Sequence, residues 1–146
     1  TGNKQLKAEP LRIISIWAKV KSELKQTQGS RLLLLLEDVY IMADAHFLKG
    51  VLQDTILDLA KRTGGPLSRT FEIHGRVQEQ ELILHISGEK RAHAHDLYST
   101  TPPSDPQIRD MDLMILKRQI GRMNGRIELS DNQGEMQYIV SFPILK

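Results

Sequence analysis

Two carboxylates and a lysine stand at helical spacing in the middle of the chain. Asp54 and Asp58 are four residues apart and Lys61 follows three residues later, so a helix would place all three on one face. Carboxylate oxygens are ligands for hard divalent cations, and a lysine offers its charge to phosphate. These residue types suit a site for a metal-bound phosphate, but charges at this spacing are also typical of a solvated helix face.

A second pair of carboxylates, Asp110 and Asp112, opens the apolar helix that we predict over residues 110–123. The free N–H groups at the start of a helix can bind an anion. An acidic side chain at the same place accepts their hydrogen bonds itself. We therefore expect Asp110 or Asp112 to cap this helix and to repel a phosphate group.

Histidines offer a weaker candidate site. His93 and His95 stand two residues apart beside Asp96, and in an extended segment they could bind zinc or another transition metal. No further ligand cluster accompanies them, so we predict no metal site. Two other histidines, His46 and His85, lack neighbours that would support general-base chemistry. We assign no catalytic residue.

Composition narrows the class of protein. A length of 146 residues suits one domain, and the net charge of +2 with few aromatic residues does not favour nucleic acid as a partner. Cysteine is absent, which fits a reducing compartment. The longest apolar run, Leu32 to Leu36, is far shorter than a bilayer-spanning helix. We expect a cytoplasmic domain without membrane contact. Because the chain begins at Thr1 and not at Met, we also expect a larger parent protein.

The hydrophobic periodicity predicts helices, strands and hairpins in alternation. The expected elements are, in order, a helix over 11–25, strands over 32–38 and 39–42, a helix over 45–62 capped by Asp44, a hairpin of 68–77 with 81–87, a long loop over 88–107, the helix over 110–123 and a hairpin of 125–129 with 136–142. We expect the leucine run to be a core strand buried on both faces. The order predicts an α+β two-layer sandwich, with about three helices on one face of a mixed sheet of about five strands.

This order of elements, with several short motifs, resembles the ATPase domain of histidine kinases. The segment 44–63 is similar to the first nucleotide-binding box of that family. The residues in register with the box are Asp44, Leu48, Val51, Leu52, Lys61 and Thr63. The sequence Gly125-Arg126-Ile127 is similar to the exit from the last box, and Phe142-Pro143-Ile144 to the end of the closing hairpin. The resemblance covers residues 9–145 and implies the same fold, with ATP and magnesium as ligands, in bacterial two-component signalling.

The departures from the family pattern fall on the residues that would contact the nucleotide. Asp54 and Asp58 replace the asparagines that contact phosphate and magnesium in the family. Gly88 stands where a family aspartate recognises the adenine amino group, and it offers no side-chain acceptor. Asp110 and Asp112 replace the glycines that open the last box. Only Lys61 keeps a residue type suited to phosphate.

We therefore expect residues 1–146 to be one degenerate histidine-kinase-like ATPase domain, the C-terminal part of a larger signalling protein. The expected function is non-catalytic and without cofactor, through contact with a response regulator, a kinase or a second copy, and with dimerisation through upstream helices. One alternative is a divergent active kinase domain, in which Asp54 or Asp58 holds magnesium and Lys61 contacts phosphate. Another is the ATPase-like part of a histidine phosphotransfer protein.

Overall fold

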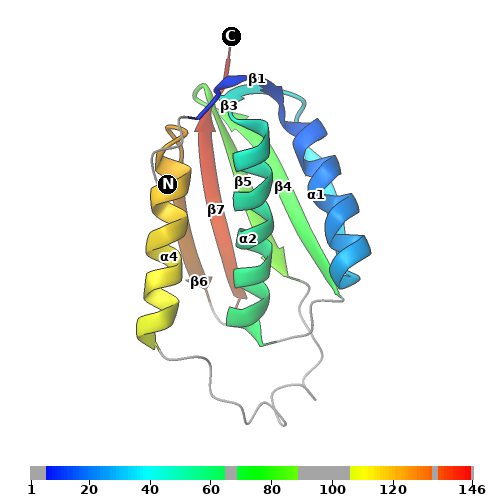
Figure 1. The fold of residues 1–146 in the computed structure, drawn as a ribbon, viewed down its shortest axis with the longest axis vertical. Helices are drawn as coiled ribbons and strands as arrows, with labels where there is room; N and C mark the ends of the chain where they lie inside the picture. The colour runs from blue at the N-terminus through cyan, green and yellow to red at the C-terminus, as the bar shows by residue number, and fades with distance from the viewer. Residues whose placement is uncertain (1–5, 65–68, 89–105, 133–134, 146) are drawn as a thin grey trace.

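A computed structural model describes residues 6–64, 69–88, 106–132 and 135–145 of the chain. Helices and strands form two layers, as Figure 1 shows. The elements are β1 (Glu9–Arg12), α1 (Ile13–Gln28), β2 (Arg31–Leu36), β3 (Tyr40–Ala43), α2 (Ala45–Thr63), β4 (Thr70–Gln78), β5 (Glu81–Gly88), α4 (Pro106–Gly121), β6 (Arg126–Asn132) and β7 (Glu135–Pro143). Among the described residues no helix is long and apolar enough to cross a membrane.

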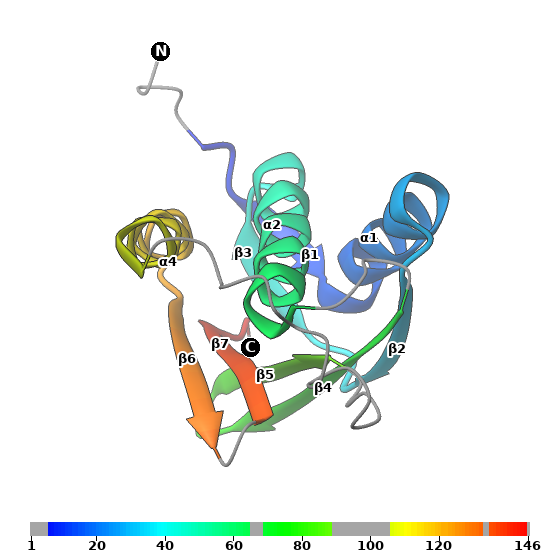
Figure 2. The ribbon, with the colours of Figure 1, turned by 90° about the horizontal axis from the view of Figure 1, so that it is seen from below.

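The main sheet has five strands in the order β2-β4-β5-β7-β6, and β1 and β3 form a separate antiparallel ribbon. β2 runs parallel to β4, and the other neighbours in the main sheet are antiparallel. Helices α1, α2 and α4 cover one face of this sheet (Figure 2). The prediction of an α+β sandwich with a mixed five-stranded sheet is confirmed.

The core lies between the helices and the inner face of the sheet. Period-2 alternation points Phe71 and Ile73 of β4 inward, while the helices contribute residues such as Trp17 and Leu52; all four are fully buried. Tyr138 of β7 is also fully buried and brings a hydroxyl group into this apolar layer. A buried hydroxyl needs a hydrogen-bond partner, and its partner lies on α2.

Helix α2 begins as the sequence predicts. The Oδ1 atom of Asp44 accepts a hydrogen bond from the Phe47 N–H at 3.1 Å, and Oδ2 accepts one from the Lys7 N–H at 2.9 Å. The helix ends at Gly64, whose φ of 69° is the left-handed conformation that closes many helices. These caps fix the ends of the helix that carries Asp54, Asp58 and Lys61.

Replacing Asp44 with Ala is expected to lower the melting temperature by about 2–5 °C at neutral pH. Hydrogen bonds from the N–H groups of Lys7 and Phe47 hold the pKa of this carboxyl below its usual value. Because its pKa is lowered in the folded state, the Asp44 carboxylate stabilises the fold fully above its unfolded-state pKa. This stabilisation is lost as the pH falls through the folded-state pKa. The difference between parent and variant in a melting series should therefore shrink under acid conditions. A difference unchanged by acid would contradict the capping role.

Two sequence predictions about the first third of the chain are wrong. The first helix does not begin at residue 11, because residues 9–12 pair with β3 and the helix starts at Ile13. The leucine run is not buried on both faces either. The three helices cover only the inner face of the sheet (Figure 2), so Leu33 and Leu35 on the outer face of the edge strand β2 remain 46% and 51% exposed.

The turn from α4 into β6 requires glycine. Asn124 adopts a positive φ of 61°, and Gly125 follows where the backbone approaches β7. A Cβ atom on Gly125 would lie 2.7 Å from the Ser141 carbonyl oxygen and 2.8 Å from the Phe142 ring. The Gly-Arg-Ile motif at 125–127 thus has a steric reason in this chain.

Candidate functional site

A groove between α2 and α4 collects most of the charged residues that the sequence singles out. Helix α2 contributes Asp54, Asp58 and Lys61, and α4 contributes Asp112 and Gln119. Apolar side chains complete its lining: Leu57, Ile115 and Leu116. As formed by these residues, the groove encloses about 190 Å³. The predicted helical spacing therefore brings three of the candidate residues together, and the packing of α4 adds a fourth.

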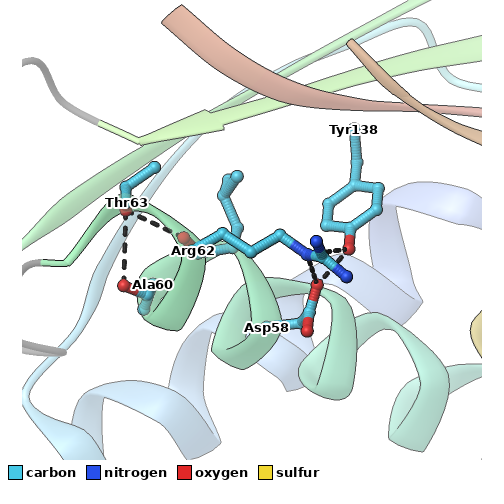
Figure 3. A network of polar contacts seen from close by, with 6 residues as sticks. Asp58, Ala60, Arg62, Thr63 and Tyr138 are labelled. Atoms are coloured by element: carbon cyan, nitrogen blue, oxygen red, sulfur yellow. Dashed lines mark hydrogen bonds and ion pairs between the residues drawn. The ribbon is translucent and has the colours of Figure 1, made fainter. Parts of the chain in front are cut away.

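Asp58 does not lie on the solvated side of α2. It is 8% exposed, and its Oδ2 atom accepts a hydrogen bond from Arg62 Nε at 2.6 Å. The Tyr138 hydroxyl donates to the same oxygen, and Arg62 Nε also donates to the Tyr138 oxygen at 3.0 Å. Figure 3 shows the three side chains converging between α2 and β7. The expectation of a fully solvated face is wrong for this residue.

The charges in this network stabilise one another. Burial raises the pKa of the Tyr138 hydroxyl well above its usual value, and the hydrogen bond to Asp58 raises it further, so the hydroxyl stays a donor. Burial alone would lower the pKa of Arg62, but the hydrogen bond with Asp58 and the nearby charges raise it above its usual value. The Asp58 carboxylate thus has a cation and a hydroxyl donor within the protein, and both contact its Oδ2 atom.

The other two residues of the predicted α2 face lie at the rim of the groove. Asp54 and Lys61 are both exposed, as expected for a solvated position. Partial burial raises the pKa of the Asp54 carboxyl, while the charge of Lys61 acts in the opposite direction. These two side chains are accessible to a ligand in the groove.

Helix α4 begins at Pro106, four residues before the predicted start. Asp110 and Asp112 therefore lie inside the helix, and the prediction that one of them caps it is wrong. Proline suits the first turn of a helix because it has no N–H group to lose. Asp112 is half-buried and faces the groove, whereas for Asp110 only the position in the helix is described.

Gly88 ends β5 and lies beside a buried arginine. Arg69, which is 7% exposed, donates to the Thr63 hydroxyl and stacks over the Phe71 ring at 5.0 Å. A Cβ atom on Gly88 would lie 3.3 Å from Arg69 Nη2. The side-chain space at position 88 is therefore next to a guanidinium group.

The candidate metal ligands His93, His95 and Asp96 lie outside the described residues. Within the described ranges, no group of three or more His, Cys, Asp and Glu side chains is placed to hold a metal ion. His46 is exposed on α2. His85 lies opposite His74 on the outer face of the sheet, away from the groove.

Sequence reasoning missed the partners of the site residues. Arg62 follows Asp58 by four residues, which is a recognisable signal for a helical ion pair. Tyr138 lies 80 residues away and carries no local signal. Arg69 could not be connected with Gly88 without the pairing of β4 with β5, which sets Phe71 opposite Gly88.

Similarity to known proteins is found among solved structures. No family model and no curated protein matches the chain. Among solved structures, the histidine kinase AdeS of Acinetobacter baumannii superposes with a TM-score of 0.65 at 19% identity, over 99% of this chain and 71% of that one. The ATP-binding domain of PrrB from Mycobacterium tuberculosis gives a TM-score of 0.67 at 10% identity, over 95% of this chain and 98% of that one.

The catalytic domain of the histidine kinase ThkA is similar to the same degree, with a TM-score of 0.65 at 15% identity over 94% of this chain and 96% of that one. These likenesses extend over almost the whole chain. They establish that the fold is that of the ATP-binding domain of histidine kinases, as the sequence resemblance implied.

Proposed function

We propose that this chain, which has the fold of a histidine kinase ATP-binding domain, is a non-catalytic module of two-component signalling that no longer binds ATP and acts by contact with other proteins. The partner would be a response regulator, a kinase or a second copy, in the cytoplasm, with dimerisation through upstream helices of a larger protein. The carrying observation is the engagement of Asp58 by Arg62 and Tyr138. Two further features support the proposal.

The Asp58 network makes magnesium binding costly. A carboxylate that coordinates Mg²⁺ must present an oxygen to the ion, and the Oδ2 atom of Asp58 already accepts hydrogen bonds from Arg62 and Tyr138. Separating a buried carboxylate from its cation costs several kcal/mol, about 3–5 in measured pairs. Position 58 therefore serves to attach α2 to β7, and metal coordination through its Oδ2 atom would weaken the fold.

The groove and the position of Gly88 add electrostatic support. Asp54 and Asp112 place two further carboxylates along the groove, against a single lysine among its lining residues. Without a cation they repel a triphosphate. At the end of β5, the side-chain space of Gly88 adjoins the guanidinium group of Arg69, a donor, whereas an adenine amino group needs an acceptor.

A divergent ATP-binding domain is the alternative, and one observation favours it. Asp54 and Lys61 are exposed at the rim of the same groove as Asp112, so a carboxylate and a cation remain accessible. In this reading Asp54 would hold magnesium and Lys61 would contact phosphate.

A melting experiment separates the two functions. With 1 mM ATP and magnesium, we expect no change in the melting temperature of the chain. A domain that binds at a Kd one hundred times below the ligand concentration gains about 2.7 kcal/mol, or roughly 5–10 °C at this size. The ATP-binding domain of PrrB is the positive control, and magnesium alone controls for ion effects. A reproducible upward shift with ATP would exclude the non-catalytic proposal.

Restoring the family residue at position 88 tests the adenine argument. We expect Gly88→Asp alone to leave the chain without ATP binding, because Arg69 Nη2 is close enough to pair with the new carboxylate. Isothermal titration with ATP and magnesium measures this directly. Binding gained by this single change would show that the pocket is intact apart from position 88.

A further inference from the structure

The edge strand β2 presents backbone hydrogen-bonding groups that pair with no other strand in the described part of the chain. Along its parallel ladder, the Arg31 N–H donates to Arg69 O and the Glu37 N–H to Gly75 O, both at 3.0 Å. Bonding residues alternate along a strand, so the odd-numbered residues face β4. The N–H and C=O groups of Leu32, Leu34 and Leu36 therefore point away from the sheet. No described strand pairs with this edge.

The outer surface of the same strand is apolar. Leu33 and Leu35 are about half exposed, and the strand contains no proline and no charged residue between Arg31 and Glu37. Natural edge strands are usually shortened, charged or covered, because an exposed apolar edge pairs readily with another strand. Six residues of unprotected edge are enough for a peptide to form a short ladder.

A basic groove lies beside this edge. A cavity of about 330 Å³ is lined by Lys21 and Lys25 of α1, by Arg31 of β2 and by Ser30, Leu32, Leu33 and Thr70. None of its lining residues is acidic. Within the described residues, no ion pair engages Lys21, Lys25 or Arg31. Three cationic side chains thus lie beside an apolar strand edge. This combination of charge and free backbone complements a ligand that has carboxylates and an extended backbone.

We propose that the β2 edge is a docking site for an extended acidic peptide segment of a partner protein, which adds to the sheet as a sixth strand beside β2. Its backbone bonds to Leu32, Leu34 and Leu36, its apolar side chains cover Leu33 and Leu35, and its carboxylates lie against Lys21, Lys25 and Arg31. This edge is at the opposite end of the sheet from β6, which α4 covers (Figure 2). The docking site does not depend on whether the α2–α4 groove binds ATP.

The position of α1 favours a peptide over a second copy. Helix α1 packs directly over β2. Two copies joined edge to edge with their helices on the same side of the sheet would bring their α1 helices to about the spacing of neighbouring strands, roughly 5 Å, whereas packed helices need about 8–10 Å. A single peptide strand carries no helix and fits beneath the side of α1.

Fluorescence anisotropy tests the site with defined probes. The probes are fluorescein-labelled peptides of about nine alternating Val and Thr residues, with two Glu residues at the amino end in one and at the carboxyl end in the other. We expect at least one to bind saturably. N-methylation of its alternate backbone nitrogens on the ladder side should abolish binding. On addition of the unmodified peptide, amide exchange should slow at Leu32, Leu34 and Leu36.

Charge reversal identifies the basic groove. Lys21→Glu with Lys25→Glu should weaken binding of the acidic peptide by about tenfold or more. Lys117→Glu with Arg118→Glu, on exposed positions of α4, makes the same change in net charge and should alter the affinity less than about twofold. If the variant with Lys21→Glu and Lys25→Glu fails to fold, the parent chain provides the test. Its binding of the peptide must weaken when salt is added, and must weaken when Lys replaces Glu in the peptide.

Four results would overturn this assignment. The first is that neither acidic peptide binds, and the second is that the N-methylated peptide binds equally well. The third is slower amide exchange only at residues outside β2. The fourth is a dimer in sedimentation whose β2 amides are already protected from exchange without peptide. Lysines beside an edge can also act only to prevent unwanted pairing. That role predicts aggregation of the charge-reversed chain without peptide binding by the parent, which also contradicts the docking site.

Discussion

Replacing Asp58 with Ala is expected to lower the free energy of unfolding by about 3 kcal/mol. The side chains of Asp58 and Arg62 are only 9% and 6% exposed, so the guanidinium group would keep its burial and lose its carboxylate. The buried Tyr138 hydroxyl would lose its acceptor as well. The change should appear as a lower midpoint in urea unfolding with an unchanged slope, because the surface exposed on unfolding stays the same.

The chain offers a matched control one helical turn earlier. Asp54→Ala removes the same charge from the same helix, but at an exposed position, and should change the stability by less than about 0.5 kcal/mol. Tyr138→Phe keeps the ion pair and removes the two hydrogen bonds of the hydroxyl group, so its effect should lie between the two. Equal midpoints for Asp58→Ala and Asp54→Ala would show that the Asp58 network does not stabilise the fold.

Replacing Gly125 with Ala is expected to destabilise the domain by about 2–3 kcal/mol. The new methyl group would lie 2.7 Å from the Ser141 carbonyl oxygen and 2.8 Å from the Phe142 ring, and neither the backbone of β7 nor the buried ring can move freely. Relief requires a local separation of β6 from β7 at the start of their ladder, where Arg126 pairs with Ser141.

Gly50→Ala is the control for this prediction. Gly50 lies inside α2, and a Cβ atom there meets nothing within 4 Å. Alanine in a helix interior is favoured over glycine by about 0.8–1 kcal/mol, so this variant should be more stable than the parent. Thermal unfolding of both variants checks the opposite signs. A loss of stability at both positions would point to a general effect of the substitution and not to crowding at position 125.

Most of the fold could be predicted from local sequence patterns. The alternation in β4 and β5, the Asp44 cap and the apolar period of α2 can be read from neighbouring residues, and all three are confirmed. The predictions failed where a distant partner decides the outcome. Leu11 joins a strand because β3 pairs with it, and Leu33 is exposed because the helices cover only the opposite face of the sheet (Figure 2).

The candidate site shows the same division. The spacing of Asp54, Asp58 and Lys61 predicted that they share a helix, and their common groove follows from it. Their different environments do not follow, because only the packing of Tyr138 against α2 distinguishes position 58 from position 54. Tyr138, which lies 80 positions away in the sequence, therefore gives Asp58 a structural role that Asp54 does not have.

The contact of Asp58 with Arg62 and Tyr138 also has an evolutionary consequence. Under the proposed loss of ATP binding, a return to nucleotide binding would need an amide at position 58, but that single step would leave a buried guanidinium beside a neutral group. The intermediate sequence would be less stable before it gained any activity. Arg62 would have to change first or at the same time, so under this proposal the ion pair would make nucleotide binding difficult to recover by single substitutions.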